Sequence, residues 1–167
     1  MTQETPAAWY AIWTRSRHEQ VVLEQLDRKG YEAFLPTIPK WSRWKDRKKK
    51  IDWPLFPGYC FARFDTRERL PILKCTGVVS ILSCDGEIAS IPDLEIDSIR
   101  RLVESDLQFD PCPLIREGAM VEVVHGPLKG VVGRLLRKGG HARLMLAVDL
   151  IGRAVSVEVD AADVKAY

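Results

Sequence analysis

A short segment with two prolines divides the sequence into two parts of different character. Residues 106–114 contain Pro111 and Pro113 and show no hydrophobic periodicity. Upstream of this segment, strand-like and helix-like stretches alternate, whereas downstream short strand-like stretches are separated by glycines. The sequence therefore predicts an α+β protein with an α/β domain over residues 1–105, a linker over 106–114 and a small all-β domain over 115–167.

The beginning of the first domain has the pattern of a strand followed by a helix. Residues 9–14 are aromatic and β-branched, which favours a strand, and alternation places Trp9 and Trp13 on the same face. Ser16 and Glu19 have the spacing of a capping box, and Gly30 follows the last apolar position of the helix. We therefore expect the helix to begin after Ser16 and to end at Gly30.

The remaining elements of both domains are expected from apolar runs and the turn residues between them. In the first domain these are a long hairpin over 36–56, a strand over 58–64, a short helix within 66–75, a ribbon of 78–82 with 87–89 that turns at Asp85-Gly86, and a helix from Pro92 to Ser105. In the second domain, strands over 121–124, 131–136, 142–148 and 154–159 are expected to form a small barrel.

Composition favours a globular chain. Hydrophobic residues make up 46% and charged residues 29% of the 167 residues, and no apolar run approaches the length of a bilayer span. The N-terminus has no signal-peptide pattern, so we expect a cytoplasmic protein without a membrane contact. Cys60, Cys75, Cys84 and Cys112 form no CxxC pair, which predicts buried or half-buried free thiols and no metal or other cofactor.

The tip of the expected hairpin is the most basic part of the chain. The net charge is only +2, yet residues 40–50 hold seven basic residues and one acid, Asp46. Trp41 and Trp44 lie among these bases. Basic residues interleaved with aromatic ones can neutralise phosphates while the rings stack on unpaired bases. A solvated hairpin end is the alternative explanation.

Tryptophan is concentrated in the same part of the sequence. All five tryptophans lie within the first 53 residues. Tryptophan and tyrosine bury a large area at a small cost in conformational entropy, so they are frequent both in cores and in partner interfaces. The aromatic residues therefore indicate either a packed core or a docking surface.

Four motifs of the first domain resemble the NusG/RfaH family of bacterial transcription elongation and antitermination factors. They are Pro54-Leu-Phe-Pro-Gly-Tyr59, Trp9-Tyr10, Phe34-Leu-Pro36 and Gly77-Val-Val-Ser80. The second domain resembles a KOW module through Gly118, Val121, Val123, Gly126-Pro127, Gly130 and Gly133. The resemblance implies an α/β sandwich with a central antiparallel sheet, followed by an SH3-like barrel.

The resemblance also implies a binding protein rather than an enzyme. In this family the N-terminal domain docks on the clamp helices of bacterial RNA polymerase and suppresses pausing or termination. Carried over by position, the polymerase-binding residues are Trp9, Trp13, Phe56, Tyr59 and Leu82. The residues carried over to upstream or non-template DNA of the transcription bubble are Arg15, Arg17, Arg43, Lys45, Arg47, Lys48, Lys49 and Lys50.

The barrel of this family recruits ribosomal protein S10 or the termination factor Rho, and we expect this chain to be a monomer. The Pro54-Leu-Phe-Pro57 sequence favours a specialised paralogue, with a general housekeeping NusG as the alternative. A ribosome-associated RNA-binding KOW protein is an alternative of another class, but it predicts a basic barrel, and residues 106–167 carry eight bases and eight acids. Neither GxSxG, HExxH nor a phosphate-binding loop accompanies the three histidines, so we expect no catalytic residues.

Overall fold

The computed structural model describes residues 6–44 and 47–167, which form two compact units. The division falls between Ile91 and Pro92. This is earlier than residue 105, where the sequence predicts the end of the first domain, because the last helix before the expected linker groups with the second unit.

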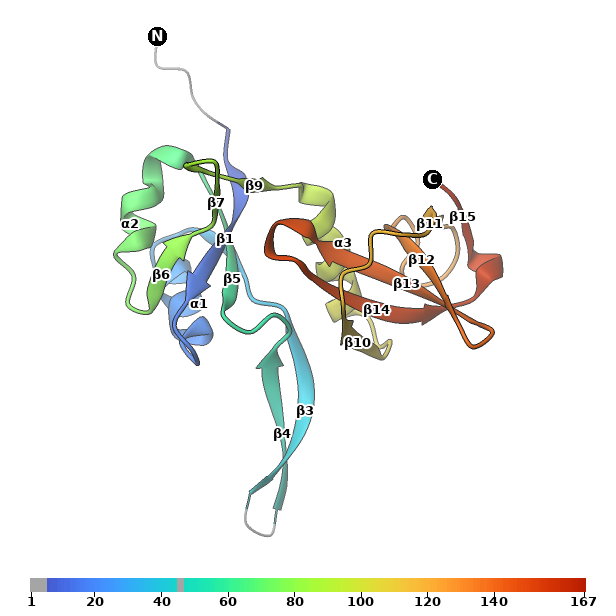
Figure 1. Ribbon diagram of the computed structural model, residues 1–167. Coiled ribbons are helices and arrows are strands. Elements are labelled where there is room, and N and C mark those ends of the chain that lie inside the picture. Colours follow the sequence, from blue (N-terminus) through green and yellow to red (C-terminus); the bar gives the residue numbers. More distant parts are fainter. Residues whose placement is uncertain (1–5, 45–46) are drawn as a thin grey trace. The chain divides into compact units, whose positions relative to one another are not determined.

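The first unit contains a central antiparallel sheet, flanking helices and a separate two-stranded hairpin (Figure 1). Its elements in chain order are β1 (Ala8–Thr14), α1 (Glu19–Arg28), β2 (Glu32–Phe34), β3 (Thr37–Trp44), β4 (Arg47–Pro54), β5 (Tyr59–Phe64), the 3-10 helix η1 (Thr66–Glu68), α2 (Arg69–Leu73), β6 (Val78–Ile81), β7 (Ser83–Cys84), β8 (Glu87–Ile88) and β9 (Ser90–Ile91).

Strand β1 lies in the middle of the central sheet. The strand order is β2-β5-β1-β6, and β9 also pairs with β1. Residues directly opposite one another on antiparallel strands project to the same face of a sheet. One face packs against the helices and forms a core of Tyr10, Ile12, Val22, Leu26, Cys60, Ala62, Phe64, Ile72, Cys75 and Ile81. The sheet is thus held by α1 and α2 on the face that carries the even-numbered residues of β1.

Helix α1 begins at Glu19, later than the predicted capping box places it. The residue before the helix is His18, and no side chain caps the helix N-terminus. Arg17 has a φ of 63°, a left-handed conformation that cannot belong to a helical turn. The capping box of Ser16 and Glu19 is therefore wrong, and the Glu19 carboxylate accepts a hydrogen bond from the Gly58 N–H instead.

The predicted long hairpin is confirmed. Strands β3 and β4 pair in continuous register from Thr37 opposite Pro54 to Trp44 opposite Arg47. Figure 1 shows them as a ribbon of their own. Near the base of this ribbon the Lys40 ammonium lies 5.9 Å from the centroid of the Trp53 ring, which is a cation–π contact.

The predicted turn at Asp85-Gly86 is also confirmed, although the ribbon is shorter than expected. Asp85 and Gly86 have φ values of 54° and 85°, as a two-residue hairpin turn with the twist of its strands requires. Only β7 and β8 pair across this turn. The preceding strand, β6, pairs with β1 instead and becomes part of the central sheet.

The second unit is an antiparallel sheet with one α-helix before it. Its elements are α3 (Asp93–Glu104), β10 (Phe109–Cys112), β11 (Met120–Val123), β12 (Val132–Lys138), β13 (His141–Val148), η2 (Asp149–Ile151), β14 (Arg153–Val159), η3 (Ala161–Asp163) and β15 (Val164–Ala166). The six strands follow the order β10-β14-β13-β12-β11-β15. The four strands predicted from the sequence are present, and the strand-rich unit agrees with the expected KOW module.

Part of the predicted linker is a strand. Residues 109–112 form β10 and pair with β14, and Phe109 is buried. Pro111 is tolerated because β10 is an edge strand of the sheet, where a missing N–H costs no hydrogen bond to a neighbouring strand. The segment predicted as a linker over 106–114 therefore includes a strand of the second unit.

The structure explains why one residue of the KOW-like motif, Gly133, is a glycine. A Cβ atom at this position would lie 2.7 Å from the Met145 carbonyl oxygen on the paired strand. Real Cβ atoms do not approach backbone so closely, so the packing of β12 on β13 requires glycine here.

Candidate functional site

The face of the central sheet that lies opposite α1 carries a row of aromatic residues. On β1 this face presents Trp9, Ala11 and Trp13. Their partners on β5 are Arg63, Phe61 and Tyr59, in the same order. The β-sheet register thus confirms that Trp9 and Trp13 share a face, as their spacing in the sequence predicts.

Exposure changes along this row. Trp9 is 2% exposed and Phe61 is completely buried, whereas Trp13 is 49% exposed. Tyr59 and Leu82 are half-buried. An accessible aromatic surface therefore lies at the Trp13 end of the row. We refer to Trp13, Tyr59 and Leu82 as the Trp13 patch.

Two residues of the predicted polymerase-binding set are buried. Phe56 is 2% exposed and packs edge-to-face on Phe61, with ring centroids 6.4 Å apart. Trp9 is equally buried. In this structure both side chains lie in the interior of the protein, which leaves Trp13, Tyr59 and Leu82 as the predicted residues with accessible surface.

A turn at Gly58 lies beside the exposed tryptophan. Gly58 has a φ of +88°, and a Cβ atom on it would lie 3.7 Å from Trp13 Nε1. Its carbonyl oxygen accepts a hydrogen bond of 2.9 Å from the Thr14 N–H. Its own N–H donates to Glu19 Oε1 over 3.0 Å. No sequence pattern links Glu19 to this turn, because the two residues lie far apart in the chain.

The two predicted nucleic-acid-binding arginines at the end of β1 lie on one exposed corner. Arg15 and Arg17 are both exposed. The Arg15 N–H donates to the Gly77 carbonyl oxygen over 2.8 Å. His18 packs so closely on Gly77 that a Cβ atom there would lie 2.9 Å from the His18 Cβ. The corner that carries the arginines is therefore fixed against the loop before β6.

The basic residues of the hairpin are distributed over both of its strands. Arg43 lies opposite Lys48, and Lys49 and Lys50 lie opposite Ser42 and Trp41. Arg47 is the first residue of β4, and Lys50 is exposed. Lys45, which belongs to the same predicted set, lies outside the described residues. The register thus places positions of basic residues on both strands at the closed end of the hairpin.

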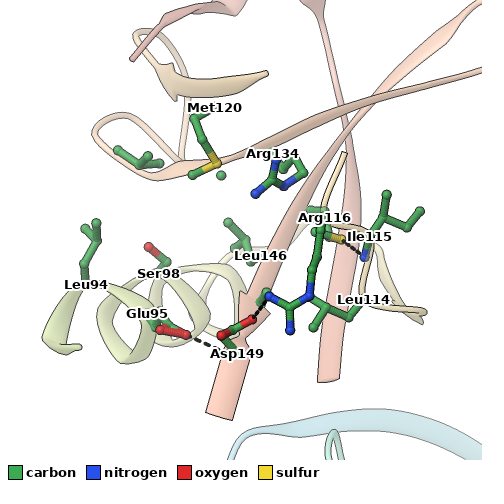
Figure 2. A pocket seen from close by; sticks show the side chains of 14 residues that line it. Leu94, Glu95, Ser98, Leu114, Ile115, Arg116, Met120, Arg134, Leu146 and Asp149 are labelled. Atoms are coloured by element: carbon green, nitrogen blue, oxygen red, sulfur yellow. Dashed lines mark hydrogen bonds and ion pairs between the residues drawn. The ribbon is translucent and has the colours of Figure 1, made fainter. Parts of the chain in front are cut away.

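A cavity of about 370 Å³ lies in the second unit, lined by residues of α3 and of the strands (Figure 2). Leu94 and Met120 contribute apolar surface to it. At its rim, Arg116 Nη1 lies 3.0 Å from Asp149 Oδ1, and the Asp149 N–H donates to Glu95 Oε1 over 2.9 Å. Burial raises the pKa of the Glu95 carboxyl, and the charge of Asp149 raises it further, while the hydrogen bond from the Asp149 N–H lowers it. No motif in the sequence predicts this cavity.

The cysteines are free thiols, as the sequence predicts, but they differ in exposure. Cys60 and Cys75 are buried and Cys112 is half-buried, whereas Cys84 is exposed, contrary to the expectation. Burial raises the pKa of Cys60 to about 12. Across residues 6–44 and 47–167, no cluster of three or more His, Cys, Asp or Glu side chains is placed to hold a metal ion. The helices in these ranges are too short or too polar to cross a membrane.

Comparison with known proteins identifies the family of the chain. Residues 7–100 match the family model described as transcription termination factor nusG. NusG of Thermotoga maritima, in a structure that describes its domain interaction, has 22% sequence identity with this chain and a TM-score of 0.53, over 96% of this chain and 97% of that one. This likeness supports the fold.

The two conformations of the MjSpt4:Spt5 complex were also matched. Conformation A has 17% sequence identity and a TM-score of 0.28, over 95% of this chain and 97% of that one, and conformation B has 17% and 0.29, over 95% of each chain. Scores this low do not bear on the fold. A search of curated proteins found no significant match. The family match covers more than half of the sequence, and the chain belongs to the NusG family of transcription factors.

Proposed function

We propose that this protein is a transcription elongation factor that binds the clamp helices of bacterial RNA polymerase through the Trp13 patch and suppresses pausing or termination. The observation that carries this proposal is the half-exposed Trp13 ring, which lies opposite Tyr59 on the sheet face away from α1. Large aromatic side chains left accessible on a folded domain are typical of partner interfaces, where they supply most of the binding free energy.

The five residues of the predicted docking set divide into two roles. Trp13, Tyr59 and Leu82 contact the polymerase, because they have accessible surface. Trp9 and Phe56 support the patch from the interior, where both are buried. The contact is mainly apolar, so its affinity depends on shape and buried area more than on ionic strength.

The basic end of the hairpin and the Arg15–Arg17 corner contact DNA of the transcription bubble. Arg15 and Arg17 are exposed, and the basic residues of the hairpin belong to both of its strands. Basic side chains of this kind can neutralise phosphates. Phosphate contacts fix the position of a protein on DNA but carry no base sequence information. These contacts therefore strengthen the polymerase complex on many templates without selecting among them.

The second unit recruits a further factor, ribosomal protein S10 or Rho, and the protein acts in the cytoplasm without a catalytic step of its own. Its eight bases and eight acids over residues 106–167 favour a protein partner over ribosomal RNA. The Pro54-Leu-Phe-Pro57 sequence favours a specialised paralogue rather than a housekeeping factor.

The proposal is tested by single-round transcription in vitro with purified core polymerase on several templates that contain known pause sites. The protein is expected to shorten pauses and to increase read-through at terminators, and Trp13→Ala is expected to remove the effect. Pause lifetimes that are identical with and without the protein on all templates contradict the proposal.

A further inference from the structure

Glu19 is a buried acid on the same face of α1 as the core residues Val22 and Leu26. It is the first residue of α1 and is 6% exposed. Removing a carboxylate from water is unfavourable unless a hydrogen bond or an opposite charge compensates. Here the Gly58 N–H supplies a hydrogen bond of 3.0 Å to Oε1. The side chain therefore joins the start of α1 to the turn before β5.

Both backbone polar groups of Gly58 are engaged by different elements. Its N–H donates to Glu19 of α1, and its carbonyl oxygen accepts from the Thr14 N–H at the end of β1. The Tyr59 N–H donates to the Phe56 carbonyl oxygen over 3.1 Å and closes the same turn. Hydrogen bonds thus hold both peptide groups that flank Gly58: Glu19 binds the Pro57–Gly58 peptide, and Thr14 and Phe56 bind the Gly58–Tyr59 peptide.

This turn lies beside the Trp13 ring. The indole Nε1 of Trp13 lies 3.7 Å, and its Cδ1 lies 3.8 Å, from the position of a Cβ atom on Gly58. Tyr59 follows Gly58 directly and lies opposite Trp13 in the sheet. A movement of the Gly58 peptide therefore changes the surface under the Trp13 ring and the first residue of β5 at the same time.

We infer that Glu19 is a positioning residue for polymerase binding: its carboxylate fixes the Gly58 turn, and the turn holds Trp13 and Tyr59 in the geometry that the polymerase recognises. The last step of this inference rests on the proposed function. Loss of the carboxylate acceptor leaves the Gly58 N–H without its hydrogen-bond partner. A rotation of the turn that exposes this N–H to water then becomes favourable. Polymerase binding must then restore the original conformation of the turn, and the entropic cost of this ordering weakens the affinity.

The test uses the full-length chain with three substitutions at one position. Glu19→Gln keeps an acceptor oxygen at the same reach, Glu19→Asp keeps the charge but shortens the side chain, and Glu19→Ala removes both. Glu24→Ala is the matched control, because Glu24 is an exposed acid on the same helix. Each variant is measured for affinity to core RNA polymerase, for hydrogen exchange of the Gly58 amide and for the NMR shift of the Trp13 indole N–H.

The Asp and Ala variants are expected to bind polymerase about 10-fold more weakly, to exchange the Gly58 amide at least about 10-fold faster and to shift the Trp13 indole signal. The Gln variant and the Glu24 control are expected to remain within about 2-fold of the wild type in both measurements. Rescue by Gln but not by Asp separates the reach of the acceptor from its charge. If the Ala variant does not fold, the comparison of Gln with Asp decides the question.

Unchanged Gly58 exchange and an unchanged Trp13 signal in folded Asp and Ala variants would overturn the inference. It is also overturned if both signals move but polymerase affinity stays at the wild-type value. Failure of the wild-type chain to bind polymerase refutes the proposed function instead, and with it the last step. The exchange and NMR measurements then still decide whether Glu19 fixes the turn.

Discussion

Trp13 and Tyr59 lie directly opposite one another on β1 and β5, beside a turn whose N–H is bound by Glu19. Trp9 is on the same face of the same strand, yet it is 2% exposed where Trp13 is 49% exposed. Residues that the resemblance to NusG factors groups into one docking set therefore differ in burial.

Substitution of the two β1 tryptophans should affect stability very differently. Trp9→Ala removes a buried ring and is expected to lower the free energy of unfolding by about 3–5 kcal/mol. Trp13→Ala removes a ring that is half exposed, so a loss of about 1–2 kcal/mol is expected. Urea denaturation of both variants measures the difference. Equal losses would show that Trp13 is as much a core residue as Trp9.

Neutralising the hairpin should change the salt dependence of DNA binding. If Arg47, Lys48, Lys49 and Lys50 each contact a phosphate, their replacement by Gln lowers the slope of log K against log salt by about 3–4. Affinity for a DNA fork, measured by fluorescence anisotropy at several salt concentrations, checks this. The control neutralises Arg28, Arg63, Arg69 and Lys74, which are exposed elsewhere on the first unit. An equal change of slope in both variants would indicate a general effect of net charge. The hairpin would then be a solvated end that makes no specific contact with phosphates.

Glu95 should make the stability of the second unit depend on pH. Burial raises its pKa above the ordinary value of 4.5. A carboxyl group whose pKa is raised by folding stabilises the folded state fully at pH values below the pKa of the unfolded state. This stabilisation is lost as the pH rises through the pKa of the folded state. The contribution of Glu95 to stability should therefore fall as the pH rises above 4.5, and Glu95→Gln should remove this fall, because its amide oxygen still accepts from the Asp149 N–H.

Thermal unfolding of the full chain at pH 4.5 and pH 7 measures this effect. Glu104→Gln is the control, because Glu104 is an exposed acid on the same helix. If the difference between wild type and Glu95→Gln is the same at both pH values, the carboxyl of Glu95 does not titrate in the expected way.

The cysteines should react with iodoacetamide in an order set by burial. Cys84 is exposed and should be alkylated first at pH 8. Cys60 should remain unmodified in the folded protein, because it is buried and its pKa is raised to about 12. Burial also raises the pKa of Cys112, so intermediate reactivity is expected there. Peptide mass spectrometry over time gives the order, with a sample in urea as the reference, and modification of Cys60 at the rate of Cys84 would contradict it.

Local patterns in the sequence were sufficient for most of the fold. Alternation predicts the shared face of Trp9 and Trp13, because side chains of a strand repeat every two residues. The turn at Asp85-Gly86 follows from the tolerance of these residues for positive φ. The long hairpin follows in the same way from two apolar runs around a charged tip.

Features that depend on distant contacts were missed or assigned wrongly. The spacing of Ser16 and Glu19 suggests a capping box, but Arg17 has a left-handed conformation and the helix begins only at Glu19. The Glu19 carboxylate accepts from the Gly58 N–H instead. The prolines near Pro111 suggest a linker, but an edge strand accepts them. The burial of Phe56 depends on its packing against Phe61 of β5, and no local sequence pattern predicts this contact.

The affinity of core RNA polymerase for the wild-type chain and for Trp13→Ala and Tyr59→Ala tests the central claim most directly. Val21→Ala is the control, since Val21 is an exposed apolar residue on α1. The docking patch predicts at least about 30-fold weaker binding for either patch variant, with far-UV circular dichroism unchanged and the control at wild-type affinity. Wild-type affinity in both patch variants would contradict the claim that this surface binds the polymerase.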